Sequence, residues 1–246
     1  MKKILILQMR PEDEASDSEF EAILRVGELK EDQVKRIRLE QPQIPEIDLN
    51  NYYAIIAGGS PYDVSLHHSK KSQTQNKIEH FYDRLFDSVV EQDFPFLGAC
   101  SGMGLLGRYS RTPISDRYSE PVGSVEVTIT DEGKYDPLLR GLPMKFQALV
   151  GHKEACDHVP HGAQLLITSK PCPVQMFRLK KNVYATQFHP EADSNEFILR
   201  IRIYKDSGYF LSAEAEALSA KVIDLDTPVP KIILKRFIDR FKQKED

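Results

Sequence analysis

A cysteine inside a cluster of small residues is the first feature of this sequence that could do chemistry. Residues 98–104 read Gly-Ala-Cys-Ser-Gly-Met-Gly and continue the uncharged apolar run 94–99. Gly-x-Cys-x-Gly is the thiol form of a nucleophile elbow, in which a buried strand turns sharply into a helix. Small neighbours leave room for Cys100 in strained backbone, and the free N–H groups of a helix that begins near Ser101 would favour a thiolate. The same residues would also suit a buried structural cysteine in a glycine-rich turn.

A histidine and a glutamate at the end of a later strand could complete an activated thiol. Residues 182–188 have strand character, and Pro190 cannot continue a sheet ladder, so we expect the strand to end at His189. Glu191 is close enough in sequence to orient the imidazole. A Cys nucleophile, a His base and an orienting carboxylate form the general arrangement of thiol catalysis. A histidine after a strand is more often a packed core residue, but its occurrence together with the cysteine elbow favours the catalytic interpretation.

Together these residues resemble the class I (triad) glutamine amidotransferase family, and within it the stand-alone GMP-synthase-like proteins. Two further motifs extend the resemblance: Gly-Gly-Ser-Pro-Tyr-Asp-Val at 58–64 and Gly-His-Lys-Glu at 151–154. With Gly-Ala-Cys-Ser-Gly-Met-Gly at 98–104 and Gln-Phe-His-Pro-Glu at 187–191, all four motifs occur in the family's order. The resemblance spans about residues 45–205.

The resemblance implies a role for each motif. Cys100 would attack the side-chain amide of glutamine, His189 would act as the base, and Glu191 would orient His189. The backbone N–H groups of Gly59 and Ser101 would form the oxyanion hole. The substrate-binding positions carried over from the family are Gly58, Met103, Gly104, Lys153 and Glu154. The last two would hold the substrate through main-chain groups, and the reaction needs neither a metal nor an organic cofactor.

One position departs from the family pattern and leaves the substrate open. The family usually has Gln or Glu where this chain has Gly104, one turn after the nucleophile, and that side chain helps shape the glutamine pocket. The first hypothesis is an amidotransferase that releases ammonia from glutamine, which a separate synthetase could accept. The second is a γ-glutamyl peptide hydrolase with the same triad, because a larger leaving group needs space that a small residue supplies. The third is a catalytically silent regulatory module.

Composition and charge narrow the class of protein. The formal net charge of −4 does not indicate a nucleic-acid groove, and no apolar run approaches membrane-spanning length. Three cysteines argue against a disulfide framework. Cys156 and Cys172 have no close Cys or His partner at zinc-finger spacing. We therefore expect a cytoplasmic protein without nucleic acid, membrane or metal. The family resemblance implies that it acts on glutamine or another γ-glutamyl small molecule.

The order of elements predicts an α/β fold with a mostly parallel central sheet flanked by helices, and the family resemblance implies a flavodoxin-like arrangement. Strands are expected over 4–9, 34–39, 52–57, 94–99, 124–130, 146–150, 165–168, 174–179 and 183–188. Helices are expected over 17–28, 76–92, from 101 onward, 194–204, 213–223 and 231–242. The second half is mostly strands, so extra antiparallel strands should extend the parallel core.

We expect residues 1–246 to form one glutamine amidotransferase-like domain, since the length suits one α/β core and no linker separates a second. A C-terminal helical extension over about 207–246 exceeds what the motifs require. Covering the sheet is its favoured role, and docking a partner is the alternative. Pro228 and Pro230 are expected to break the chain before the last helix.

Overall fold

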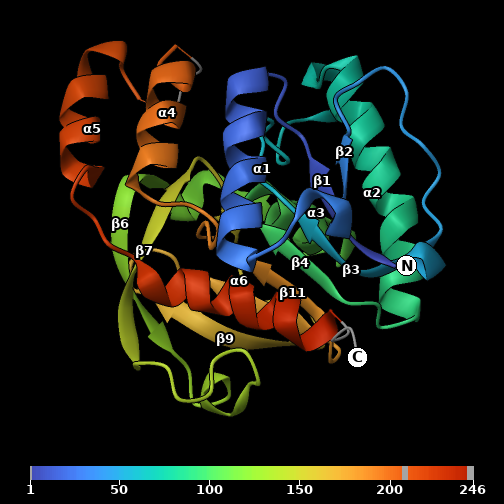
Figure 1. Ribbon diagram of the computed structural model, residues 1–246. Helices are drawn as coiled ribbons and strands as arrows, with labels where there is room; N and C mark the ends of the chain where they lie inside the picture. Colours follow the sequence, from blue (N-terminus) through green and yellow to red (C-terminus); the bar gives the residue numbers. More distant parts are fainter. Residues whose placement is uncertain (1, 207–209, 243–246) are drawn as a thin grey trace.

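A large mixed sheet forms the centre of the molecule (Figure 1). The computed structural model describes residues 2–206 and 210–242. The nine strands of this sheet lie in the order β2-β1-β3-β4-β11-β10-β9-β6-β7. Its parallel strands are β1 (Lys3–Gln8), β2 (Val34–Arg38), β3 (Tyr52–Ala57), β4 (Phe96–Ala99) and β11 (Val183–Thr186). Its antiparallel strands are β6 (Glu120–Ile129), β7 (Lys145–His152), β9 (Ala163–Ser169) and β10 (Met176–Leu179). The predicted α/β fold is confirmed.

Helices cover both faces of the parallel strands. The helices are α1 (Asp13–Gly27), α2 (Gln73–Glu91), α3 (Ser101–Tyr109), α4 (Ser194–Tyr204), α5 (Ala215–Val222) and α6 (Pro228–Phe241). Ile4 and Ile6 of β1 share one core with residues of α1 and α6, which cross in front of the sheet in Figure 1. Leu5 and Leu7 point the opposite way and pack with α2 and α3. Because successive strand residues point to opposite faces, this all-apolar run is buried on both sides.

The helices α1 and α6 begin earlier than the sequence predicts. α1 begins at Asp13 rather than at residue 17, because the acidic residues before its apolar stripe form the first turn, where the helix dipole favours negative charge. α6 begins at Pro228, so the expectation that Pro228 and Pro230 break the chain is wrong. Proline is tolerated in the first helical turn, where backbone N–H groups have no partner within the helix. The sequence also misses a small two-stranded sheet of β5 (Ile114–Ser115) and β8 (Ala155–Cys156).

The C-terminal helices pack onto the rest of the chain. A Cβ atom on Gly27 of α1 would lie 2.6 Å from Cδ1 of Ile238, and the ring of Phe237 meets Tyr184 of β11 edge-on. α4 and α5 stand side by side and share a core with Leu149 of β7 (Figure 1). The segments 207–209 and 243–246 of the expected extension lie outside the described residues, and the assignment of one domain to the whole chain remains a prediction. None of the helices in the described part of the chain combines the length and apolar character needed to cross a membrane.

Four parallel strands end at one edge of the sheet. β1, β3, β4 and β11 are neighbours in that order, so the segments that follow them lie close together. These segments carry Arg10, Gly59, Cys100 and His189. Open α/β sheets bind their ligands outside the carboxyl ends of the strands, which makes this edge the candidate site.

Candidate active site

The turn between β4 and α3 holds Cys100 in an unusual backbone conformation. Its φ of 52° and ψ of −103° are values that residues with side chains rarely adopt. The N–H of Cys100 donates to the carbonyl oxygen of Thr186 on β11 at 2.7 Å. A Cβ atom on Gly98 would lie 2.7 Å from the carbonyl carbon of Gly102, so α3 can cross β4 this closely only because Gly98 has no side chain. The structure therefore has the strand–turn–helix geometry of a nucleophile elbow.

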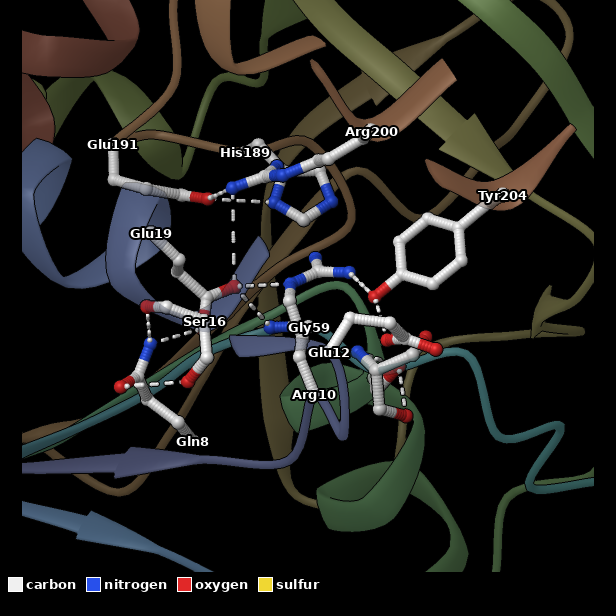
Figure 2. Close-up of polar contacts among 12 residues, drawn as sticks. Gln8, Arg10, Glu12, Ser16, Glu19, Gly59, His189, Glu191, Arg200 and Tyr204 are labelled. Carbon is white, nitrogen blue, oxygen red and sulfur yellow. Dashed lines mark hydrogen bonds and ion pairs between the residues drawn. The ribbon is translucent and has the colours of Figure 1, made fainter. Parts of the chain in front are cut away.

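His189, in the segment after β11, is held by a buried carboxylate (Figure 2). Its Nδ1 lies 2.8 Å from Oε1 of Glu191. The same oxygen accepts a hydrogen bond from Nη2 of Arg200 at 2.9 Å. Because Nδ1 is engaged by Glu191, Nε2 is the ring nitrogen left for chemistry. His189 and Cys100 line the same cavity, so the structure brings the predicted nucleophile, base and orienting carboxylate together.

Burial and nearby charges set the protonation of these groups. Burial lowers the pKa of His189, although Glu191 opposes the shift. Burial raises the pKa of Cys100 to about 11, although the cations Arg10 and Arg200 oppose it. Burial also disfavours the ionised form of Glu191, but His189 and Arg200 outweigh it and hold the pKa of that carboxyl below its usual range. At neutral pH the site therefore pairs a neutral imidazole with a neutral thiol, and the thiol would have to lose its proton in order to act as a nucleophile.

A second buried carboxylate, Glu19 of α1, engages an N–H group that the sequence assigns to the oxyanion hole (Figure 2). Oε1 of Glu19 accepts hydrogen bonds from the N–H of Gly59 at 3.2 Å and from Nε of Arg10 at 2.9 Å. Oε2 accepts one from Nε2 of Gln8 at 3.0 Å. A Cβ atom on Gly58 would lie 2.3 Å from Oε2 of Glu19. Gly58 therefore allows the loop to approach Glu19, and the Gly59 N–H is directed at this carboxylate rather than at a substrate.

The sequence reasoning missed Arg10, Glu19 and Arg200. They come from the segment after β1, from α1 and from α4, and only the folded chain joins them. Nη2 of Arg200 lies 3.8 Å from Oε1 of Glu19, so this arginine bridges the two buried carboxylates. Only Arg10 could have been suggested from the sequence. It directly follows a buried strand, and sheets of this kind bind ligands at the edge where their strands end.

A second, smaller cavity also borders Cys100. Among the residues that line it are Ser60, Ser101, Gly104, Lys153 and Glu154. Three of the five predicted substrate positions thus lie at this cavity. Met103 does not line it, because its side chain is fully buried in the core between α2 and α3. Its backbone N–H donates to the carbonyl of Cys100 within the first turn of α3.

The side chains of Lys153 and Glu154 are attached to the loop after β3. Nζ of Lys153 lies 3.0 Å from Oδ2 of Asp63. The carboxylate of Glu154 accepts hydrogen bonds from the N–H groups of Val64 and, at 2.8 Å, Ser65. These contacts fix the 151–154 segment against the loop that forms the opposite wall of the cavity. The main-chain contact of this segment with a substrate remains a prediction.

Gly104 faces the second cavity without a side chain. A Cβ atom there would lie 3.5 Å from Cγ2 of Val64, which is an ordinary van der Waals contact. Packing therefore does not require glycine at this position. The departure from the family pattern leaves space beside the nucleophile that a Gln or Glu side chain would otherwise fill.

Glu120, His152 and Cys172 form a buried group. Their spacing along the chain did not predict that they would lie together. Their potential ligand atoms lie within 4.8 Å of one another, as in a site that could hold a metal ion. Nε2 of His152 lies 2.8 Å from Oε2 of Glu120, and Nδ1 lies 3.0 Å from the carbonyl oxygen of Glu154. The imidazole thereby braces the segment that borders the second cavity. Separate elements, β6, β7 and the β9–β10 connection, supply the three side chains.

Comparison with known families decides the class of protein. A model of the family described as glutamine amidotransferase class-I matches residues 14–202. The chain belongs to the class-I glutamine amidotransferase family. This class-I glutamine amidotransferase is 31% identical over 156 residues to one subunit of a glutamine-hydrolyzing GMP synthase from Sulfurisphaera tokodaii, covering 63% of this chain and 76% of the relative.

Longer relatives contain this class-I glutamine amidotransferase region as a part. The chain is 27% identical over 198 residues to a glutamine-hydrolyzing GMP synthase from Borrelia garinii subsp. bavariensis. That match covers 78% of this chain but only 34% of the relative, so the chain spans about a third of the length of this enzyme. A glutamine amidotransferase from Thermotoga maritima has the same fold, with a TM-score of 0.69, 18% identity, and coverage of 97% of this chain and 100% of the other.

Proposed function

We propose that this protein hydrolyses the side-chain amide of glutamine through Cys100, His189 and Glu191. The observation that carries the proposal is the cavity shared by Cys100 and His189, with Nδ1 of His189 held 2.8 Å from Glu191. Membership in the class-I glutamine amidotransferase family supports the same chemistry. A thiol, a base and an orienting carboxylate are the three side chains of an activated-thiol mechanism for acyl transfer.

In the first half-reaction, the sulfur of Cys100 adds to the γ-carbonyl carbon of glutamine while Nε2 of His189 takes the thiol proton. Glu191 and Arg200 keep the imidazole oriented, and the ionised Glu191 stabilises its cationic form. The tetrahedral intermediate collapses when its C–N bond breaks. His189 returns the proton to the leaving nitrogen, ammonia departs, and a glutamyl thioester remains on Cys100.

In the second half-reaction, water hydrolyses the thioester. Nε2 of His189 takes a proton from the water as its oxygen attacks the thioester carbon, and the C–S bond breaks. The proton passes to the sulfur, so glutamate leaves and the thiol is restored. The N–H of Ser101, in the first turn of α3, supplies an oxyanion donor in both halves, because it has no partner within the helix. The Gly59 N–H would join it only after release from Glu19.

The ammonia acceptor is proposed to be a separate synthetase chain. Relatives that this chain resembles over most of their length are named as one subunit of a GMP synthase, whereas longer relatives carry the name of the whole enzyme. Those names support an arrangement in which one chain hydrolyses glutamine and a second chain uses the ammonia. The cavity that extends from Cys100 and His189 to Arg10 and Tyr204 favours a second candidate, hydrolysis of larger γ-glutamyl amides by the same residues.

The proposed function is tested by offering glutamine to the purified full chain. We expect equal amounts of ammonia and glutamate, and a protein species heavier by one glutamyl group after rapid acid quenching. Asparagine, which is shorter by one methylene, is the matched control and should give little ammonia, because its amide cannot reach the sulfur from the same subsite. Absence of both ammonia and the acylated species with glutamine would contradict the proposal.

The pH dependence of glutamine hydrolysis should reflect the lowered pKa of the buried His189 imidazole. Burial lowers the pKa of His189, so its neutral, proton-accepting form persists to lower pH than that of an exposed histidine. The acidic limb of the kcat/KM profile is therefore expected to have its midpoint below about 6.5, the ordinary histidine value. Initial rates across the acid range, with circular dichroism to confirm folding, measure it. A midpoint above that value would show that His189 is not held neutral by burial.

A further inference from the structure

The cavity shared by Cys100 and His189 extends toward α4, away from the predicted glutamine positions. It has a volume of about 50 Å³, compared with about 20 Å³ for the second cavity. Its lining includes Arg10, Arg200, Tyr204 and Phe197 in addition to the two catalytic candidates. We call it the arginine pocket. Cys100 borders both the arginine pocket and the second cavity. A substrate whose scissile amide joins two parts would need space on both sides of the nucleophile.

Arg10 brings a buried cation to this pocket. Its Nε donates to Glu19, and its Nη1 lies 3.4 Å from the hydroxyl of Tyr204, which is a long hydrogen bond. Its Nη2 donates to no acceptor among the described residues. This nitrogen would lie 2.6 Å from a Cβ atom on Gly59, whose other close neighbour is the ring of His189, and Figure 2 shows the guanidinium pointing toward that ring. Arg10 thus directs an N–H group toward the reacting centre.

Arg200 brings a second cation with unused donors. One nitrogen, Nη2, donates to Glu191. Nε and Nη1 are buried and have no hydrogen-bond partner within the described part of the chain. A guanidinium has five N–H donors and no acceptor, and leaving buried donors unpaired costs free energy. The two arginines together therefore present more donors than their protein acceptors use.

The carboxylates around the pocket are already engaged. Glu19 accepts from Arg10, Gln8 and Gly59, and Glu191 lies between His189 and Arg200. Glu12 accepts from the hydroxyl of Tyr204 at 2.8 Å. These anions balance the cations, but donors on both arginines remain without an acceptor among the described residues, and both arginines line the pocket. A further anionic group could accept hydrogen bonds there. The remaining wall is apolar and is formed by Val122, Phe197, Ile201 and Phe210.

We propose that the arginine pocket receives the leaving group of a γ-glutamyl dipeptide, an apolar amino acid whose α-carboxylate binds Arg10 and Arg200. This inference rests on the proposed function and deepens it by naming the substrate class. The γ-glutamyl part occupies the second cavity. The bond that breaks joins its γ-carbonyl carbon to the amine nitrogen of the second amino acid, and His189 supplies that nitrogen with the proton taken from Cys100.

The place of the two arginines and the chemistry of the pocket suit this leaving group. The α-carboxylate of an amino acid is separated from its nitrogen by one carbon atom, so a carboxylate receptor must lie next to the catalytic residues, as Arg10 and Arg200 do. Two guanidinium groups suit the paired oxygens of a carboxylate. The apolar wall suits a side chain such as that of leucine. Ammonia, which is small and has neither a carboxylate nor an apolar side chain, would use neither feature.

The wild-type protein tests the inference without any mutation. γ-Glutamyl-leucine and γ-glutamyl-leucinamide have the same shape, but only the first has a carboxylate in the leaving group. We expect kcat/KM to be about 10- to 100-fold higher for the acid than for the amide, the effect of a charge-assisted hydrogen-bonded contact. High salt should reduce this ratio only slightly, because the two arginines are buried.

A pair of arginine variants assigns the preference to the pocket. Arg10→Gln removes a pocket cation and is expected to lower the acid-to-amide ratio about tenfold, whatever it does to the absolute rate. Arg202→Gln is the matched control. Arg202 lies on α4 close to Arg200, but its side chain is exposed and paired with Glu14, so the ratio should stay at the wild-type value. Melting temperatures show whether either variant is folded.

The outcomes distinguish failure of the pocket assignment from failure of the proposed function. Turnover of both dipeptides without preference for the acid, or turnover of glutamine with neither dipeptide cleaved, would overturn the pocket assignment and leave the proposed function standing. A preference for the acid that survives Arg10→Gln in a folded protein would also overturn it. No Cys100-dependent turnover of any of the three substrates would overturn the proposed function, and the pocket assignment with it. A strong preference for the acid that falls in Arg10→Gln and not in Arg202→Gln supports the pocket assignment, and Cys100-dependent release of ammonia from glutamine supports the proposed function.

Discussion

Replacement of Cys100 by serine is expected to lower the rate of glutamine hydrolysis by on the order of a thousandfold or more, with the fold intact. A serine hydroxyl is a much weaker nucleophile than a thiol, and His189 is a weak base for removing its proton because burial lowers the pKa of the imidazole. The shape of the elbow should persist, because oxygen replaces sulfur at the same backbone position. Ammonia release measures the rate, and circular dichroism together with the melting temperature measures the fold.

Cys172→Ser is the matched control for this experiment. Cys172 is a buried thiol that lines neither of the cavities bordering Cys100, and its Sγ lies 3.7 Å from the carbonyl oxygen of Val174, to which a serine hydroxyl could also donate. Turnover by this variant should remain close to that of the wild type. Substantial ammonia release by Cys100→Ser would remove Cys100 as the nucleophile, whereas equal losses in both variants would indicate a general effect of the substitution on the fold.

Gly98→Ala should damage the site through the backbone rather than through any reacting group. The new Cβ atom would lie 2.7 Å from the carbonyl carbon and 2.8 Å from the carbonyl oxygen of Gly102, so α3 must move away from β4. Forcing atoms into a packed interior costs about 1–3 kcal/mol, and each kcal/mol lowers the melting temperature of a chain of this size by about 2–4 °C. Activity should fall as well, since the same displacement moves Cys100 relative to His189.

Gly123→Ala provides the comparison for Gly98→Ala. A Cβ atom on Gly123, in β6, would meet no heavy atom within 4 Å. Its melting temperature and activity should match those of the wild type or rise slightly, because alanine restricts the unfolded chain more than glycine does. A Gly98→Ala protein with unchanged stability and activity would show that the crossing of α3 over β4 is not as tight as the structure indicates.

The sequence alone predicted the fold class and the candidate triad because both depend on local patterns. The apolar run before Cys100 and the Gly-x-Cys-x-Gly spacing indicate a strand that turns into a helix, and β4 and α3 have this arrangement. Glu191 could be assigned to His189 because the two are separated by only one residue. Each of these inferences needs only neighbouring residues and the periodicity of strands and helices.

The surroundings of the triad could not be predicted because they are assembled from distant segments. Arg200 lies on a helix with no strong apolar stripe, so the sequence predicts an ordinary surface arginine there. In the structure its side chain is buried against Glu191. Glu19 is fully buried although it stands among acidic residues of α1. Only this packing reveals that Gly59 donates to Glu19 and that Met103 belongs to the core.

The pairing of β4 with β11 has a consequence for how the protein becomes active during synthesis and refolding. The two strands lie side by side in the sheet, but the strands from β5 to β10 come between them along the chain. Contacts between distant segments form late, because a long loop must close first. A nascent chain therefore carries Cys100 well before His189, and the proposed catalytic pair exists only once β11 has docked beside β4. The recovery of glutamine hydrolysis during refolding would report when β11 docks beside β4.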